Sequence, residues 1–431
     1  MTSVMKKLLN VKGIVVEDIG FEPFGNDETL IVKVRPMARQ KSRCGLCGKK
    51  SPGYDSGTKA RRWRSLDFGT FRVYIEYDLP RVRCRKHGVI AARVPWARHD
   101  SWFTRDFEDT VAWLMLHATR SCVSDLMRIA WETTGAIAKR VYDDAKMAAQ
   151  DPFESLERIG IDETSYKKGQ KYMTVVVDHD TGALIWAAKG HGKKVLDSFF
   201  QAMTEEQRSS IKFATGDGAG WITDCVEQWC PNAERCIDPF HVVQWATEAL
   251  DEIRRGAWRD AKNQEPARAK RSKGRPKKGE EKTQSKASAV KGARYALLKN
   301  PENRTPMQDA QLELVVKSNP MLYRAYLLKE MLRLVFKLPL DQAKEELGRW
   351  IKWAQRCRIP EFVELQRKIR RHMDAILAAI GNGLSNARIE AVNNKIKVTV
   401  RMGYGFRNID NMIALLMLRC SKLDIALPGR A

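Results

Sequence analysis

Three acidic residues, far apart in the sequence, are placed where a fold could bring their carboxylates together. Asp162 ends a run with period-two apolar residues, so we expect it at the end of a strand. Asp217 follows the strand-like segment 211–216, and Glu390 lies on the ridge beside a buried helical stripe. Each alone is ordinary, because Asp is common in turns and Glu on solvated helices. Together, three carboxylates could hold two Mg²⁺ or Mn²⁺ ions about 3.5 to 4 Å apart.

A second group of residues has the types and spacing of a zinc site. Cys44 and Cys47 form one pair of ligands, and Cys84 and His87 form another, each pair enclosing two residues. Four nitrogen and sulfur ligands suit a closed, structural Zn²⁺ site. We expect a hairpin containing the strand-like segment 71–77 to be the ribbon between the pairs. The alternative is that the second pair is unrelated to the first.

The segment after the cysteines has helical periodicity. A helix is expected from Phe103, a shorter one holds apolar residues at 123–130, and Thr133 or Thr134 can cap a third. Lys139 and Arg140 face outward from this third helix. The order is typical of a helix-turn-helix, although small helical pairs are mostly structural. Its position after a zinc ribbon favours DNA recognition.

Charge supports a polyanionic partner. The chain of 431 residues has 76 Lys and Arg against 52 Asp and Glu, a net charge of +24. Arg61, Arg62 and Arg64 flank an aromatic residue near the cysteines and suit phosphate contact. Residues 262–294 hold twelve Lys or Arg and three Glu, which predicts a mobile basic loop. Without a long apolar run or leader, we expect a soluble, cytoplasmic, nucleoid-associated protein.

The remaining pattern predicts a multidomain α+β protein. Strand-like segments alternating with helices surround both aspartates. Residues 307–380 are expected to be helical throughout, with Leu327, Met331 and Leu334 on one face. Two more helices are expected after this segment. This arrangement is that of an RNase H-like mixed α/β domain interrupted by an all-helical insertion. The expected domains are a zinc-ribbon domain at 1–100, a helix-turn-helix at 101–150, a first catalytic part at 151–245, a helical insertion at 246–380 with the basic loop 262–294, and a last catalytic part at 381–431.

With these motifs in place, the chain resembles bacterial insertion-sequence transposases of the DDE type, specifically the ISL-three group. The resemblance spans nearly the whole chain, and its last motif is the most specific. It departs from the group in ending the second zinc pair with a histidine and in the length of its basic loop. The residues that carry it are Ile161-Asp-Glu-Thr-Ser165, Gly216-Asp-Gly-Ala219, Asp238-Pro-Phe-His-Val-Val243, Asn386-Ala-Arg-Ile-Glu-Ala-Val-Asn-Asn-Lys-Ile-Lys397 and Arg401-Met-Gly-Tyr-Gly-Phe-Arg407.

The resemblance implies roles for individual residues. It implies that Asp162, Asp217 and Glu390 are the catalytic acids, and that Asp238 and His241 support them. An aromatic residue of the helical insertion is expected to stack on a flipped base, with Trp258 the candidate. The expected contacts to double-stranded DNA are made by Arg61, Arg62, Arg64, Lys139, Arg140, Trp258, Lys397 and Arg401.

The expected activity is cleavage and joining of DNA. The enzyme would bind the terminal inverted repeats of a mobile element, use Mg²⁺ or Mn²⁺ for chemistry and Zn²⁺ for structure, and act as a homodimer or larger assembly on DNA. One alternative is a regulator that binds DNA without cutting it. Another is an RNase H-like nuclease that hydrolyses without joining.

Overall fold

The structure, a computed structural model, describes residues 2–24, 27–57, 60–264, 286–383, 387–425 and 427–429. The chain forms two compact units. Unit 1 comprises Met1–Asp151 and Lys395–Ala431, and unit 2 comprises Pro152–Asn394. Across the described ranges, no helix is both long enough and apolar enough to span a membrane.

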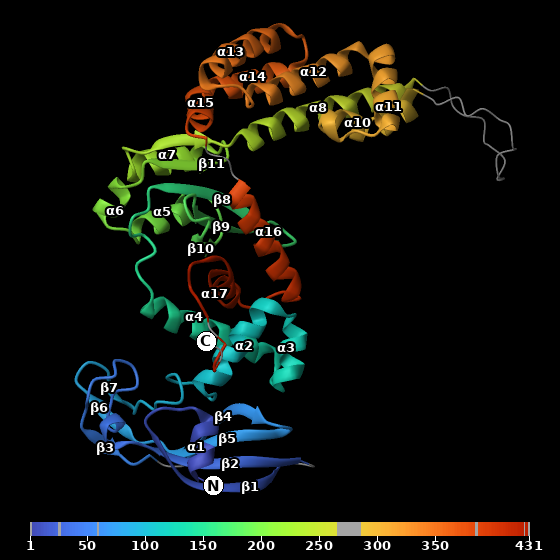
Figure 1. Cartoon of the computed structure of the whole chain (residues 1–431). Helices are drawn as coiled ribbons and strands as arrows, with labels where there is room; N and C mark the ends of the chain where they lie inside the picture. The colour runs from blue at the N-terminus through green and yellow to red at the C-terminus, as the bar shows by residue number, and fades with distance from the viewer. Residues whose placement is uncertain are drawn as a thin grey trace, which may run out of the picture. The chain divides into compact units, whose positions relative to one another are not determined.

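Unit 1 begins with a four-stranded sheet of order β1-β2-β5-β4 (Figure 1). The first two strands form an antiparallel hairpin, β5 runs parallel to β2, and β4 is antiparallel to β5. Buried Trp63, Ile75 and Trp96 pack on one face, with the short helix α1 (Thr2–Leu9) against β1. The strands are β1 (Ile14–Phe24), β2 (Asp27–Pro36), β4 (Ala60–Phe68) and β5 (Phe71–Asp78).

The cysteine pairs lie on a different, three-stranded sheet of order β3-β6-β7. The prediction that segment 71–77 is part of the zinc ribbon was therefore wrong. Apolar residues of β5 alternate into the larger core, which recruits that strand to the four-stranded sheet. The ribbon strands are β3 (Gly53–Asp55), β6 (Arg81–Cys84) and β7 (Gly88–Ala91).

Helices complete unit 1. Thr104 and Thr119 cap α2 and α3, but α4 begins at Trp131 rather than after the Thr pair, so the predicted cap was wrong. Thr134 is instead buried in the first turn of α4, where its hydroxyl donates to the carbonyl of Trp131. The described helices here are α2 (Arg105–His117), α3 (Arg120–Met127), α4 (Trp131–Ala148), the end of α16 (Ala387–Met402) and α17 (Ile409–Cys420), which packs on α4.

Unit 2 contains a five-stranded sheet of order β10-β9-β8-β11-β12. The three strands β8, β11 and β12 are parallel, whereas β9 and β10 are antiparallel to their neighbours. This mixed sheet followed by a helical insertion confirms the predicted fold class. The strands are β8 (Arg158–Lys167), β9 (Lys171–Asp178), β10 (Leu184–Lys189), β11 (Phe213–Gly216) and β12 (Glu234–Ile237).

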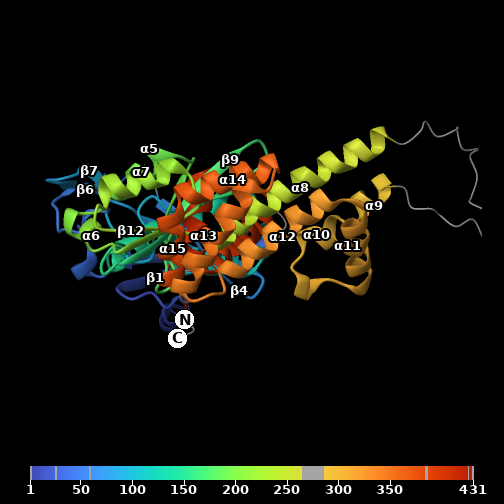
Figure 2. The ribbon, with the colours of Figure 1, turned by 90° about the horizontal axis from the view of Figure 1, so that it is seen from above.

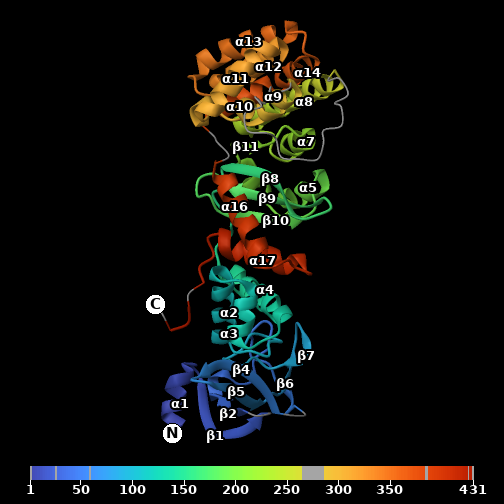
Figure 3. The same ribbon diagram turned by 90° about the vertical axis from the view of Figure 1, so that its right-hand side faces the viewer.

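Helices cover both faces of this sheet (Figure 3). Ile159 and Ile161 point into a core closed by α5 (Lys193–Gln201) and α7 (Gly220–Trp229). The start of α16 covers the opposite face, where a Cβ on Gly160 would lie 2.1 Å from Ile389 Cδ1. Glycine at this position therefore lets α16 approach the strand closely. The short helix α6 (Glu205–Ser209) precedes β11.

The helical insertion is a bundle built around the long α8 (Figure 2). Its core includes Leu328, Leu332 and Trp350, whereas Leu327 and Leu334 are exposed, so the predicted face was one residue out of phase. The helices are α8 (Pro239–Asn263), α9 (Lys286–Gly292), α10 (Arg294–Leu298), α11 (Pro306–Ser318), α12 (Pro320–Val335), α13 (Leu340–Arg356), α14 (Pro360–Arg371) and α15 (Met373–Gly381).

Most of the predicted basic loop, residues 265–285, lies outside the described residues. Its flanks are helical, because α8 extends to Asn263 and α9 begins at Lys286. The predicted limits of 262 and 294 were therefore too wide. Ala287 and Val290 of α9 are buried in contact with the bundle, which accounts for helix where charge counting predicted a loop.

Candidate active site, zinc centre and nucleic-acid interface

Adjacent parallel strands bring the aspartates together. Thr215 of β11 pairs with Gly160 of β8, so two residues further along Asp217 is expected beside Asp162. Asp162 lies within β8 rather than at its end, which corrects the sequence prediction. Burial raises the pKa of Asp162, and the nearby charge of Asp217 raises it further. The two carboxylates thus form a pair of like charges near the carboxyl end of β11.

Arg235 of β12 braces the loop that holds Asp217. It donates through Nη2 to the carbonyl of Asp217 and through Nη1 to the carbonyl of Ala214, at 3.2 Å. Burial lowers the pKa of Arg235 to about 10, against the opposing charge of Asp217. Asp217 Oδ1 accepts from the backbone N–H of Ala219 at 2.9 Å. This aspartate is therefore held by its neighbours at the strand end.

Helix α16 contacts this pair through Asn393, a residue to which the sequence analysis assigned no role. Its Nδ2 donates to Asp162 Oδ2 at 2.5 Å. From Ile389 to Asn393 the helix rises about 6 Å, and from Gly160 to Asp162 the strand rises about 6.7 Å. The two spacings match, so when Ile389 packs on Gly160, Asn393 lies beside Asp162. Glu390 has an exposed side chain and precedes Asn393 by three residues, about 60° around the helix.

Asp238 and His241 stand at the start of α8. Asp238 is the N-cap residue, and its Oδ1 accepts from the backbone N–H of Phe240 at 3.1 Å. The charge of His241 favours ionisation of Asp162. The structure therefore brings Asp162, Asp217 and His241 together, with Asp238 one strand further along. The pKa of Glu163, the residue after Asp162 in β8, is raised by burial and also by the charges of Asp217 and Asp162.

The predicted zinc ligands converge in unit 1. The ligand atoms of Cys44, Cys47, Cys84 and His87 all lie within 4.8 Å of one another. Cys44, the first residue of the first ligand pair, is buried. In the second pair, hydrogen bonds from the backbone N–H groups of His87 and Lys86 lower the pKa of Cys84 to about 6. A thiolate is the form that binds Zn²⁺, so both the residue types and the clustering fit this ion.

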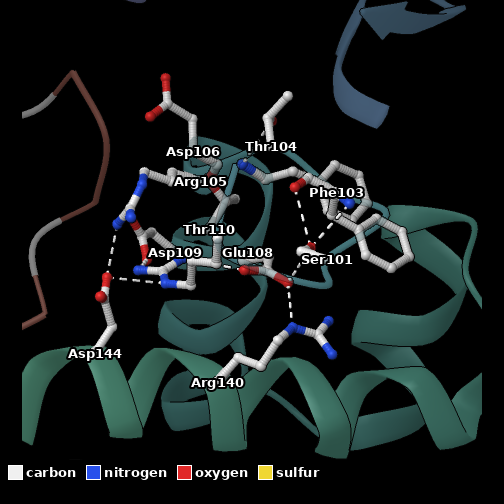
Figure 4. Close-up of polar contacts among 12 residues, drawn as sticks. Ser101, Phe103, Thr104, Arg105, Asp106, Glu108, Asp109, Thr110, Arg140 and Asp144 are labelled. Carbon is white, nitrogen blue, oxygen red and sulfur yellow. Dashed lines mark hydrogen bonds and ion pairs between the residues drawn. The ribbon is translucent and has the colours of Figure 1, made fainter. Parts of the chain in front are cut away.

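A network of charged side chains joins α2, α4 and the segment before α2 (Figure 4). Glu108 of α2 is fully buried and accepts from Arg140 Nε at 2.7 Å, from Ser101 Oγ at 2.7 Å and from Arg98 Nη1 at 3.2 Å. Arg98 also donates to Asp144 of α4 at 3.0 Å. Arg140, predicted as a DNA contact, thus fixes α4 to α2, although the rest of its guanidinium extends away from the carboxylate (Figure 4).

We expect Glu108→Ala to lower the free energy of unfolding of unit 1 by about 3 kcal/mol, because it removes the buried carboxylate that accepts from Arg140, Ser101 and Arg98. Urea unfolding followed by tryptophan fluorescence measures this change. Asp125→Ala, at an exposed position of α3, is the matched control and should shift stability by about 0.5 kcal/mol at most. Equal effects of the two variants would contradict a structural role for the Glu108 network.

The other predicted cations differ in exposure. Arg64 is 5% exposed and pairs with Asp67, so it lacks the surface for a phosphate contact, which corrects that prediction. Arg62 bridges Glu22 and Glu76. Arg61 stands over the exposed ring of Trp102, 4.3 Å from its centroid.

On the helices, Lys139 pairs with Asp143 at 2.5 Å, whereas Lys397 and Arg401 are exposed on α16. Trp258 is half-buried on α8 with Lys262 above its ring. It is 20 residues beyond Asp238, or about 30 Å of helix, so the structure does not bring it to the aspartates. Base stacking by Trp258 stays a prediction for a DNA segment at that distance.

Comparison with known families decides the class of this chain. Residues 159–416, which contain both aspartates and α16, match a family profile described as the transposase domain of the ISL3 group. The chain belongs to the ISL3 family of transposases. It is a DNA transposase of the DDE type. Two more ISL3 profiles match, the zinc finger of transposases IS204, IS1001, IS1096 and IS1165 at 40–87 and the helix-turn-helix domain at 92–142.

Full-length relatives agree with these ISL3 profiles. The chain is 49% identical to the transposase for insertion sequence element IS1557 from two Mycobacterium tuberculosis strains, over 99% of this chain and 97% of theirs. It is 24% identical to the transposase for element IS1001 of Bordetella parapertussis, over 99% and 98%. The zinc-ribbon and helix-turn-helix matches make this ISL3 transposase a DNA-binding protein with a structural zinc domain.

Proposed function

We propose that this transposase binds the terminal inverted repeats of an insertion sequence and catalyses metal-dependent DNA cleavage and strand transfer. The observation that carries the proposal is the half-buried pair Asp162, on β8, and Asp217, directly after the parallel strand β11, with α16 contacting Asp162 through Asn393 and also carrying Glu390. The relatives named for insertion sequence elements support the choice of DNA.

The donor set suits hard divalent cations. Asp162 and Asp217 repel each other, and burial disfavours the charge on Asp162, so a bound cation would offset both effects. We propose that these two residues hold Mg²⁺ or Mn²⁺ together with Glu390. When bound, two such ions supply Lewis-acid chemistry that favours the attacking and leaving oxygens of an in-line displacement.

The chain's own residues do the positioning. Asn393 fixes the orientation of Asp162, and Arg235 holds the carbonyl of Asp217. The charge of a protonated His241 would favour the ionised form of Asp162. The zinc ribbon and helix-turn-helix would place the element's end, with Lys139, Lys397 and Arg401 as candidate phosphate contacts. Because two ends must be processed together, we propose a homodimer or larger assembly on DNA.

A strand-transfer assay with a pre-cleaved element end tests this function. The purified transposase, Mg²⁺ and a target plasmid should yield joined product, because a free 3′-hydroxyl can attack target DNA without a new cleavage step. Hydrolysis without joining would identify a nuclease. Binding of the end without either reaction would identify a regulator.

We expect Asn393→Ala to lower the cleavage rate roughly 10- to 100-fold, the usual effect of removing a partner that orients a metal ligand. Single-turnover cleavage of an end-containing duplex measures the rate. Asn394→Ala changes the exposed neighbouring amide and should leave the rate within about twofold. If both variants cleave like the wild type, Asn393 has no part in orienting Asp162.

A further inference from the structure

Lys368 of α14 lies on the helical insertion at its border with the sheet. Its Nζ is 3.5 Å from the centroid of the Trp245 ring on α8, a cation–π contact. Trp245 is seven residues beyond Asp238, about 10 Å along α8, and so lies at the catalytic end of that helix. Both side chains are half-buried, so the ammonium group keeps a path to solvent.

Trp245 joins this lysine to the loop that contains Asp217. A Cβ on Gly218 would lie 2.5 Å from Cη2 of the Trp245 ring, so glycine is required for the ring to pack there. Lys368 stands over the same ring. The loop after Asp217, the indole and the ammonium group are therefore consecutive contacts between the sheet and the bundle.

Lys368 lacks a direct carboxylate partner among the described residues. Over the residues that the structure describes, its Nζ makes no ion pair within 4.0 Å. Burial lowers the pKa of Lys368, while the charges of Asp217 and Glu248 favour its protonated form. By contrast, the more deeply buried Lys329 pairs directly with Glu330.

Two arginines contribute to the positive charge near Lys368. The pKa of His372 is lowered by burial and by the charges of Arg371, Lys368 and Arg235. Positive side chains thus lie near Asp217, one of the two carboxylates proposed to hold divalent cations. These positive side chains favour an anion at this place, and the phosphodiester of the DNA substrate is the anion that the proposed reaction brings there.

We propose that Lys368, held over Trp245, contacts a phosphate of the DNA strand bound at Asp217, and that Trp245 is its positioning residue. The inference rests on the proposed function, since it names the part of the helical insertion that meets the substrate. It assigns phosphate contact to a side chain about 20 Å nearer the catalytic end of α8 than Trp258.

The test is a double-mutant cycle for DNA binding, in which the charge of Lys368 and the charge of one DNA phosphate are removed separately and together. Wild-type enzyme and Lys368→Met are titrated, in Ca²⁺, with an element end carrying either a normal phosphate or a neutral methylphosphonate at the scissile position. For wild type, we expect neutral substitution to weaken binding about tenfold. For Lys368→Met, neutral substitution should weaken binding less than it does for wild type, because one of the charges that contact this phosphate is gone while the bound Ca²⁺ remains.

Two further variants keep the test decisive. Lys368→Arg retains the charge and should restore much of the discrimination, whereas Arg367→Ala, at the exposed adjacent position, should behave like wild type. Cleavage in Mg²⁺ should fall about 100-fold in Lys368→Met. Equal discrimination by wild type and folded Lys368→Met would overturn the inference, even if cleavage and joining proceed. Absence of cleavage by wild type would instead defeat the proposed function while the binding cycle still reports on Lys368.

Discussion

Asp162→Asn should abolish strand cleavage in Mg²⁺ while binding of the element end remains intact. The substitution keeps the size of the side chain and an oxygen that can accept from Asn393, but it removes the charge that a divalent ion needs. Loss of several kcal/mol of transition-state stabilisation corresponds to a rate lower by about a thousand-fold or more. Single-turnover cleavage and a gel shift with the same duplex measure the two properties.

The stability of Asp162→Asn distinguishes this loss from misfolding. Burial and Asp217 raise the pKa of Asp162 in the folded protein, so its ionised form opposes folding at neutral pH. The metal-free variant should therefore be at least as stable as the wild type at pH 7. This difference should shrink as the pH falls through the raised pKa. Asp224→Asn, at an exposed position of α7, is the control and should cleave normally.

Glu390 requires its own test, because its side chain is exposed whereas Asn393 contacts Asp162 directly. If Glu390 completes the set of acids, Glu390→Gln should match the loss in Asp162→Asn. Normal cleavage by Glu390→Gln would remove it from the set. Glu163, which lies within the electrostatic influence of both aspartates, would then be the first residue to examine as the third acid.

The aspartates were predictable because strand patterns are local and parallel strands align their ends. Period-two residues around Ile161 and the strand before Asp217 are visible in the sequence, and their side-by-side pairing follows from the fold class. Asn393 was not predictable in the same way. An amide on a helix has many uses, and its contact with Asp162 depends on the packing of Ile389 over Gly160, 229 residues earlier in the chain.

Errors elsewhere arose where packing overrides a local signal. Thr133 and Thr134 have cap chemistry, yet α4 starts at Trp131, whose ring packs against the guanidinium of Arg120 at 3.4 Å. In α12 the helical period was right but its phase was wrong, because Leu327 and Leu328 are equally apolar and only the bundle selects which one is buried.

The cysteine pairs were predictable from spacing, but the strands around them were not. The spacing of the zinc ligands predicts only that Cys44 and Cys84 lie close together. It does not predict the sheet to which β5, between them in the chain, belongs, because that depends on where the apolar face of β5 is buried. The number of residues between the two ligand pairs therefore does not predict which strands form the ribbon. Here the larger core around Trp63 recruits β5, and three short strands are left for the ribbon.

Cys84→Ser should remove zinc and unfold the ribbon sheet β3-β6-β7. The three strands have 3, 4 and 4 residues, too little apolar surface to fold unaided. Structural zinc contributes about 10 kcal/mol or more in small zinc domains, which exceeds what such a sheet can replace. Zinc content per chain and hydrogen exchange of β6 and β7 measure the loss, and the element end should bind more weakly because the ribbon helps to place it.

Cys122→Ser provides the matched control, since this cysteine is exposed on α3 within the same unit and lies outside the ligand cluster. It should retain one zinc per chain and normal exchange, because the thiol contributes neither a ligand nor packing. Chelation of wild-type enzyme should reproduce the Cys84→Ser phenotype and be reversed by added Zn²⁺, whereas the variant should not recover. Stoichiometric zinc and protected β6 and β7 amides in Cys84→Ser would show that the ribbon folds without this ligand, and a structural role for the four-ligand site would have to be abandoned.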